Sequence, residues 1–285
     1  MRKIALLAVI AFAAACGDSS TTDPGTGYLR VGNLSPDLGP FDFCVAPTGT
    51  TTYTGPVMAA AGANGGLVFG GSGQASVSKY FAYTAGTYDV KLVAIGGSCS
   101  STALLTRTGL SLDNGVYKLL AAVGFTGSTT APHALTTFTD ETTVAAGSVA
   151  IRFANVGILP GATFGPLPAI DVGVTIANVY SKIFTNVAYP GVAASGVDAN
   201  GYAVVPASNF TGSVDLTVCP NPLTPASGFC QSTTVPAGSI TGGVVATAYV
   251  IGVAGTPPNA LLCGDNTPPP AAGYQFSLCT TALAP

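Results

Sequence analysis

The 285-residue sequence has few charged side chains, one histidine and no tryptophan. Only 7% of its residues are Asp, Glu, Lys or Arg, against roughly a quarter in an ordinary soluble domain. This shortage excludes a coiled coil, which needs abundant Glu, Lys and Arg, because Glu141 is the only glutamate. A formal net charge of −3 excludes the basic surface of a nucleic-acid-binding protein. Ordinary disorder is excluded as well, since it requires low hydrophobicity and high charge.

Apolar residues, glycine and proline are plentiful. Hydrophobic residues make up 48% of the chain, which also contains 37 glycines and 21 prolines. The composition indicates a β-prone chain that is long enough for one large domain or two of ordinary size.

The first 15 residues have the form of a secretory signal peptide. Arg2 and Lys3 precede an apolar run at residues 4–15. As a helix this run would rise about 18 Å, which is too short to cross a hydrocarbon core of roughly 30 Å. A basic start, a short apolar stretch and a small-residue end are typical of a cleaved signal peptide. We therefore expect residues 1–15 to be a signal peptide.

Cys16 follows Ala13-Ala14-Ala15 and resembles the lipid-carrying cysteine of bacterial lipoproteins. In that family, the cysteine becomes the first mature residue. Leu is usual where Ala13 stands, and the alanines also fit an ordinary secretory cleavage site, which remains the alternative. The seven cysteines favour lipidation, because using Cys16 leaves an even set of six for disulfides in an oxidising compartment. Residues 16–27 are then the lipidated cysteine and a flexible tether.

The remainder of the chain contains an internal repeat. Four segments of the first half match four segments of the second half in the same order, with offsets of 122 to 129 residues. Such collinear matches predict tandem modules at residues 28–140 and 149–285. The matched segments are residues 28–34 with 150–156, 40–45 with 169–174, 88–92 with 214–218, and 112–115 with 235–238.

Both modules have the pattern of short β-strands. Apolar residues alternate with polar or small ones, and Asn114-Gly115 and Asn200-Gly201 are typical of tight turns. We predict an all-β protein made of two tandem antiparallel β-sandwich, immunoglobulin-like modules. Residues 216–264 carry no charged side chain. Within this stretch, the β-branched residues and glycines of residues 238–255 favour a buried strand over a membrane helix.

The first module resembles the bacterial domain of unknown function 4397 (DUF 4397). The resemblance rests on LRVGNLSPD at residues 29–37, FDF at 41–43, YFAYTAGTYDV at 80–90 and LSLDNGVY at 110–117. The second module looks like a diverged copy. The resemblance implies an exported β-sandwich without an established activity. The family commonly has His where Asn33 stands, so no role of that His is carried over.

No group of residues in the sequence has the pattern of a catalytic or metal site. His133 is the only histidine, and the cysteines lack the paired CxxC spacing of a zinc site. A triad would have to use His133, which we instead expect to be a solvent-facing strand residue. We therefore predict a protein that is not an enzyme and that needs no cofactor and no metal.

Two repeat-related Arg and Asp pairs are the most notable polar residues. Arg30 with Asp42, and Arg152 with Asp171, occupy the outward phase of two early strands in each module. We expect cross-strand ion pairs on the surface. The alternative is a pair that faces a ligand in a groove.

The six remaining cysteines predict three disulfides. Cys44 and Cys99 are the only cysteines of the first module and should pair with each other. In the second module, Cys219 with Cys230 and Cys263 with Cys279 would close short loops.

Together these features predict a non-enzymatic, lipid-anchored cell-envelope protein that acts as a structural or binding module. We expect it to be exported to the outer membrane or cell surface of a bacterium, where the lipid on Cys16 binds the membrane. Its other partner would be an envelope protein or a glycan, and nucleic acid is excluded. The alternative is a glycan-binding surface module that uses loop aromatics such as Tyr53 and Tyr80.

Overall fold

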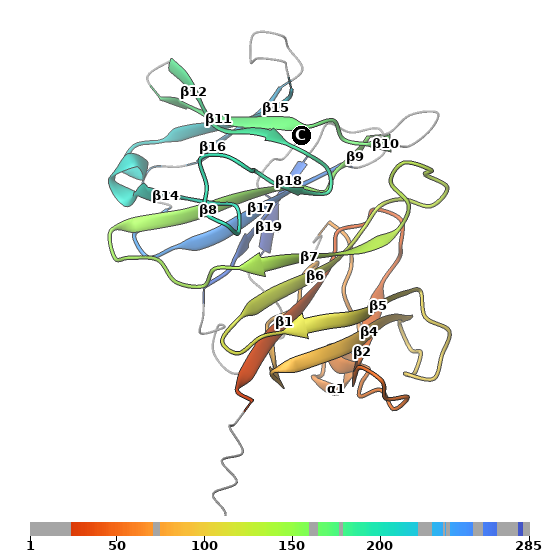
Figure 1. Ribbon diagram of the computed structural model, residues 1–285. Coiled ribbons are helices and arrows are strands. Elements are labelled where there is room, and N and C mark those ends of the chain that lie inside the picture. Colours follow the sequence, from red (N-terminus) through yellow and green to blue (C-terminus); the bar gives the residue numbers. More distant parts are fainter. Residues whose placement is uncertain are drawn as a thin grey trace, which may run out of the picture.

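The computed structural model is nearly all β, which confirms the predicted fold class (Figure 1). It describes residues 24–70, 75–159, 165–176, 179–221, 230–235, 237, 240–252, 259–266 and 279–281. The signal peptide, Cys16 and most of the tether predicted from the sequence lie outside these residues. Within the described part of the chain, no helix has the length and apolar character needed to span a membrane.

The first sandwich, coloured red to yellow in Figure 1, has two sheets. One sheet has the strand order β3-β1-β6-β7, and the other has the order β2-β4-β5. The elements are β1 (Thr26–Asn33), β2 (Phe41–Pro47), α1 (Val57–Ala60), β3 (Phe81–Thr84), β4 (Gly86–Ala94), β5 (Leu105–Leu112), β6 (Tyr117–Val123) and β7 (Ala134–Asp140).

The second sandwich, coloured green to blue, also has two main sheets. One has the order β13-β8-β17-β18-β19, with β14 also paired to β8, and the other has the order β12-β11-β15-β16. The small strands β9 (Ile158–Leu159) and β10 (Gly165–Pro166) pair with each other. The remaining elements are β8 (Ser148–Asn155), β11 (Ile170–Ile176), β12 (Val179–Val187), β13 (Gly191–Val192), β14 (Tyr202–Pro206), η1 (Ala207–Phe210), β15 (Val214–Pro220), β16 (Gln231–Val235), β17 (Val245–Ile251), β18 (Asn259–Gly264) and β19 (Cys279–Thr281).

Strand pairing follows the same order in both sandwiches. β2 pairs with β4 and β4 with β5, as β11 pairs with β15 and β15 with β16. β1 runs parallel to β6, and β8 runs parallel to β17. These parallel pairs depart from the antiparallel pairing that we expected. They arise because the chain passes through the opposite sheet before it returns, and such a long crossover allows two strands to run in the same direction.

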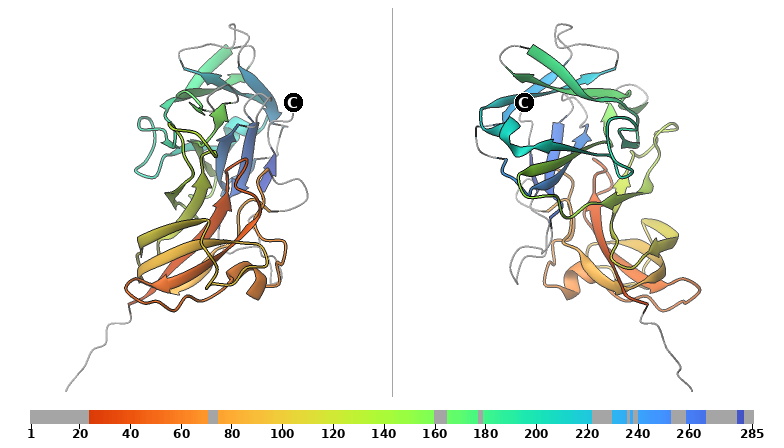
Figure 2. Two further views of the ribbon diagram at one scale, coloured as in Figure 1. Left: turned by 90° about the vertical axis from the view of Figure 1, so that its right-hand side faces the viewer. Right: turned by 60° about the vertical axis from the view of Figure 1, so that its left-hand side comes forward.

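The two sandwiches pack against each other through one sheet of each, so the molecule has four layers (Figure 2). The central strands of the two middle sheets, β1 and β6 in one and β8 and β17 in the other, are therefore largely buried on both faces. In β6, Leu120 and Ala122 face the core of the first sandwich, whereas Leu119 and Ala121 face an apolar cluster between the sandwiches. All seven residues of β17 are buried, which confirms the buried strand predicted within the charge-free stretch.

Candidate functional site

The predicted Arg30–Asp42 and Arg152–Asp171 ion pairs are wrong. Both arginines are fully buried, and their ion-pair partners are Asp140 and Asp265. The alternation of apolar and polar residues along β1 and β8 puts each arginine on the face of its strand that points away from the core of its own sandwich. That face is not solvent-exposed, because the other sandwich covers it.

Four charged side chains form a buried cluster between the middle sheets. The Arg30 Nε donates to Asp140 Oδ2 at 2.9 Å, and the Arg30 Nη2 pairs with Asp265. The Arg152 Nη2 pairs with the other oxygen of Asp140. Asp140 therefore bridges an arginine of β1 and an arginine of β8. The cluster holds two guanidinium groups and two carboxylates, so its side-chain charges balance.

Two tyrosines complete the cluster with the same geometry in each sandwich. The Tyr80 hydroxyl donates to Asp140 Oδ2 at 2.8 Å, and the Tyr202 hydroxyl donates to Asp265 Oδ2 at 2.8 Å. The Arg30 Cζ lies 4.8 Å from the centre of the Tyr80 ring, and the Arg152 Cζ lies 4.5 Å from that of Tyr202. Each sandwich thus contributes one arginine, one tyrosine and one aspartate.

Burial and opposite charges act against each other on the ionisation of these groups. Burial alone would lower the pKa of the Arg30 guanidinium, but Asp140 and its other neighbours raise that pKa well above the usual value. Burial raises the pKa of the Asp265 carboxyl, and Arg30 opposes this shift. Burial also raises the pKa of the Tyr80 and Tyr202 hydroxyls, which therefore remain hydrogen-bond donors. The cluster is suited to holding two sheets together.

Sequence reasoning missed Asp140, Asp265 and Tyr202. A signal for them was present, because Asp140 and Asp265 are 125 residues apart and Tyr80 and Tyr202 are 122 apart, within the offsets of the repeat. The strand register shows that these residues occupy equivalent positions in the two sandwiches. Arg152 pairs with Tyr202 across β8 and β14, and the backbone of Asp265 bonds to Val245 at the start of β17. Tyr117, which begins β6, likewise lies opposite Asp140.

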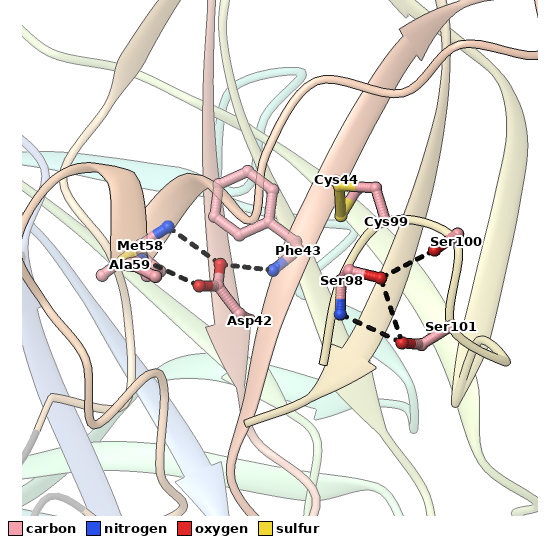
Figure 3. Close-up of a disulfide and its surroundings, with 9 residues drawn as sticks. All are labelled: Asp42, Phe43, Cys44, Met58, Ala59, Ser98, Cys99, Ser100 and Ser101. Carbon is pink, nitrogen blue, oxygen red and sulfur yellow. Dashed lines mark hydrogen bonds between the residues drawn. A yellow bond between two sulfur atoms is a disulfide. The ribbon is translucent and has the colours of Figure 1, made fainter. Parts of the chain in front are cut away.

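The two remaining predicted site residues, Asp42 and Asp171, accept hydrogen bonds from nearby backbone N–H groups. Asp42 accepts hydrogen bonds from the backbone N–H groups of Met58 and Ala59, both at 2.8 Å, at the start of α1 (Figure 3). Asp171 accepts from the Asn186 backbone N–H at 2.8 Å and forms an ion pair with Lys182. Asp42 therefore holds α1 to its sheet, whereas Asp171 binds β12, the neighbouring strand of its own sheet.

Replacing Asp42 by Ala should lower the free energy of unfolding by about 1–3 kcal/mol, because it leaves the buried N–H group of Met58 and the partly buried one of Ala59 without their acceptor. Urea denaturation measures the loss. Asp42→Asn should retain part of the stability, since the amide oxygen still accepts one hydrogen bond. A loss no larger for Ala than for Asn would contradict this role of Asp42.

Acid should weaken the contacts of Asp171. Burial alone would raise the pKa of this carboxyl, but hydrogen bonds from Lys182, Asn186 and Asn221 lower it below the usual value. The resulting stability is present above the unfolded-state pKa of about 4 and is lost as pH falls through the lower folded-state value. Asp171→Asn should therefore reduce stability at neutral pH and flatten its decline below about pH 4. Urea midpoints measured across that range test this, and an unchanged slope would contradict it.

The structure confirms two of the predicted disulfides. Cys44 is bonded to Cys99, and Cys219 to Cys230 (Figure 3 shows the first). Cys263 is also disulfide-bonded, and the register of β18 and β19 sets its backbone opposite that of Cys279. The side chain of Cys279 lies outside the described part of the structure. Disulfides indicate an oxidising compartment, as expected for an exported protein.

The aromatics considered for glycan binding have other contacts. Tyr80 belongs to the buried cluster, and its ring packs edge-on against Tyr117 with centroids 5.1 Å apart. The Lys91 Nζ lies 4.6 Å from the centre of the Tyr53 ring. The Nε2 of His133 hydrogen-bonds to Asp37 at 2.8 Å. Among the residues that the structure describes, no group of three or more His, Cys, Asp or Glu could hold a metal ion.

A protein-family model matches part of the chain. Residues 50–162 match the family described as Domain of unknown function (DUF4397). The matched range contains two of the four motifs that carry the resemblance, at residues 80–90 and 110–117, and it extends through β8 into β9. No curated protein matches the chain. The family resemblance is therefore confirmed for residues 50–162, and through this region the chain is similar to the DUF4397 family.

Proposed function

We propose that this protein is a non-enzymatic, lipid-anchored component of the bacterial cell envelope that acts as a rigid structural or binding module. The observation that carries the proposal is the buried cluster in which Asp140 binds both Arg30 and Arg152. Separating the sandwiches would break these ion pairs and would expose the apolar cluster between them, and exposing buried apolar surface is costly. The cluster therefore supports a unit in which two sandwiches keep a fixed relative position.

The repeated strand order supports two tandem modules, as proposed from the sequence, with the boundary between β7 and β8. The disulfides support an exported location. The proposed tether at residues 16–27 would connect this unit to a lipid on Cys16. A module of this kind would hold a binding surface at a set distance from the membrane.

Calorimetry tests the rigid unit. We expect the unmodified protein to unfold in a single transition, and Asp140→Asn to unfold in two, because the bridge between Arg30 and Arg152 is weakened. Asp113→Asn is the matched control, since the described side-chain contacts of Asp113, an ion pair with Lys118 and a hydrogen bond from Ser111, lie at the surface. Two transitions in the unmodified protein, or one unchanged transition in Asp140→Asn, would count against the proposal.

Metabolic labelling with palmitate tests the anchor separately. We expect label on the unmodified protein and none on Cys16→Ser. Label that persists in the variant, or that is missing from the unmodified protein, would remove the lipid anchor and favour ordinary secretory cleavage. This result would leave the rigid two-sandwich unit unaffected.

The glycan-binding alternative is less favoured, because Tyr80 donates its hydroxyl to Asp140 and stacks on Arg30. A glycan array tests the alternative directly. Binding that is lost in Tyr53→Ala would restore it. An array on which no glycan binds the protein would support the structural module.

A further inference from the structure

A cavity of about 400 Å³ lies in the second sandwich, between the inner sheet containing β8 and the outer sheet containing β15. Its walls include Val149 and Phe153 of β8, Phe184 of β12 and Val214 of β15, which are all buried. Half-buried side chains, Val205 and Leu216 among them, also line it. The cavity therefore has a buried interior and a side that solvent can reach.

The cavity coincides with a division in the apolar core. In the second sandwich, the described core residues between the sheets form two clusters, and Ile151 is packed against both. The core of the first sandwich is one cluster, which Met58 and Leu67 complete from the segment between β2 and β3. Protein interiors are normally packed as densely as organic crystals. A space of this size inside one sandwich is typical of a binding site.

The lining determines which ligands fit. Among the described lining residues none carries a charge, and the single polar side chain is that of Thr234. The Thr234 hydroxyl donates to Asp215 at 2.6 Å on the outer face of the sheet, because Asp215 is exposed and lies between Val214 and Leu216, which face the cavity. A charge within the cavity would lose its hydration and would find no partner among the described lining residues. The lining therefore favours an uncharged, apolar molecule.

We propose that this cavity binds a small uncharged apolar molecule, such as an aliphatic chain of moderate length without a charged head group. A cavity of about 150 Å³ lined by Leu, Ile and Phe is large enough for benzene, so a volume of about 400 Å³ accommodates a longer chain or a substituted ring. This inference goes beyond the proposed structural role, because it assigns a ligand class to one sandwich. It does not depend on the lipid anchor.

Titration calorimetry with hexanol, heptanol and octanol tests the proposal on the unmodified protein. We expect one binding site and an affinity that rises about fourfold with each added methylene, which is the free-energy gain from its burial. Octanoate should bind at least about tenfold more weakly than octanol, because its carboxylate would lose its hydration. No binding of the alcohols, or equal binding of octanoate, would overturn the proposal.

Two neighbouring residues of β14 provide a matched pair of variants. Val205 lines the cavity, whereas Val204 points to the opposite face and is 58% exposed. Val205→Phe should weaken octanol binding at least about tenfold, since the ring occupies the space of several methylenes. Val204→Phe should bind as the unmodified protein does. Equal binding by both variants would contradict the assigned site.

A second cavity-filling variant keeps the proposal testable if the first variant does not fold. Ala203 also lines the cavity, and Ala203→Leu adds less volume than a phenylalanine ring. If Val205→Phe unfolds, Ala203→Leu must reduce octanol affinity while it retains the unfolding midpoint of the unmodified protein. Undiminished affinity in a folded Ala203→Leu variant would overturn the proposal.

Discussion

Replacing Arg30 by Met should lower the free energy of unfolding by about 3–5 kcal/mol, which is typical when one partner of a buried ion pair is removed. Arg30 binds both Asp140 and Asp265 without exposure to solvent. Without Arg30, Arg152 still pairs with Asp140, but Asp265 loses its ion-pair partner inside the protein. Urea denaturation at neutral pH measures the effect.

Two further variants show whether the loss comes from an uncompensated charge. Adding Asp265→Asn to Arg30→Met should recover part of the stability, because it removes the unpaired carboxylate while the amide oxygen can still accept from Tyr202. Lys118→Met breaks an exposed ion pair with Asp113 and should cost at most about 1 kcal/mol. Equal losses for Arg30→Met and Lys118→Met would show that the buried cluster contributes little.

Removing the Cys44–Cys99 disulfide should have an effect of similar size. The two cysteines are 55 residues apart, and the loop-entropy relation gives roughly 4 kcal/mol for a loop of this length. The double variant Cys44→Ala/Cys99→Ala avoids a free thiol. Its unfolding midpoint under oxidising conditions measures the loss.

The second disulfide provides the comparison. Cys219 and Cys230 are only 11 residues apart, so the same relation gives roughly 3 kcal/mol. The double variant Cys219→Ala/Cys230→Ala should therefore be less destabilised. If this pair proved the more costly to remove, local packing rather than loop closure would dominate.

The two confirmed disulfides could be predicted because few pairings were open to these cysteines. Cys44 and Cys99 were the only cysteines available to each other in the first module, and Cys219 and Cys230 are separated by a short loop. Strands were predictable for a different reason. Apolar alternation reports directly which residues of a strand lie on one face.

The buried cluster could not be predicted in the same way. A period of two assigns Arg30 to a face, but it carries no information about what covers that face. Asp265 lies 235 residues from Arg30, and the two meet only because one sheet packs on another. The prediction therefore paired Arg30 with Asp42, a residue near it in the sequence that actually binds the backbone of α1.

The low charge content has a clear explanation in the packing. The sequence by itself determined the all-β class, the confirmed disulfides and the buried strand that corresponds to β17. Only the tertiary structure decided that the central strands of the middle sheets are largely buried on both faces, which leaves few positions for charged residues in β6 and β17. It also decided that Arg30, Arg152, Asp140 and Asp265 share one buried site. The physical reason is that sheet-on-sheet packing joins residues through space, whereas strand periodicity acts only along the chain.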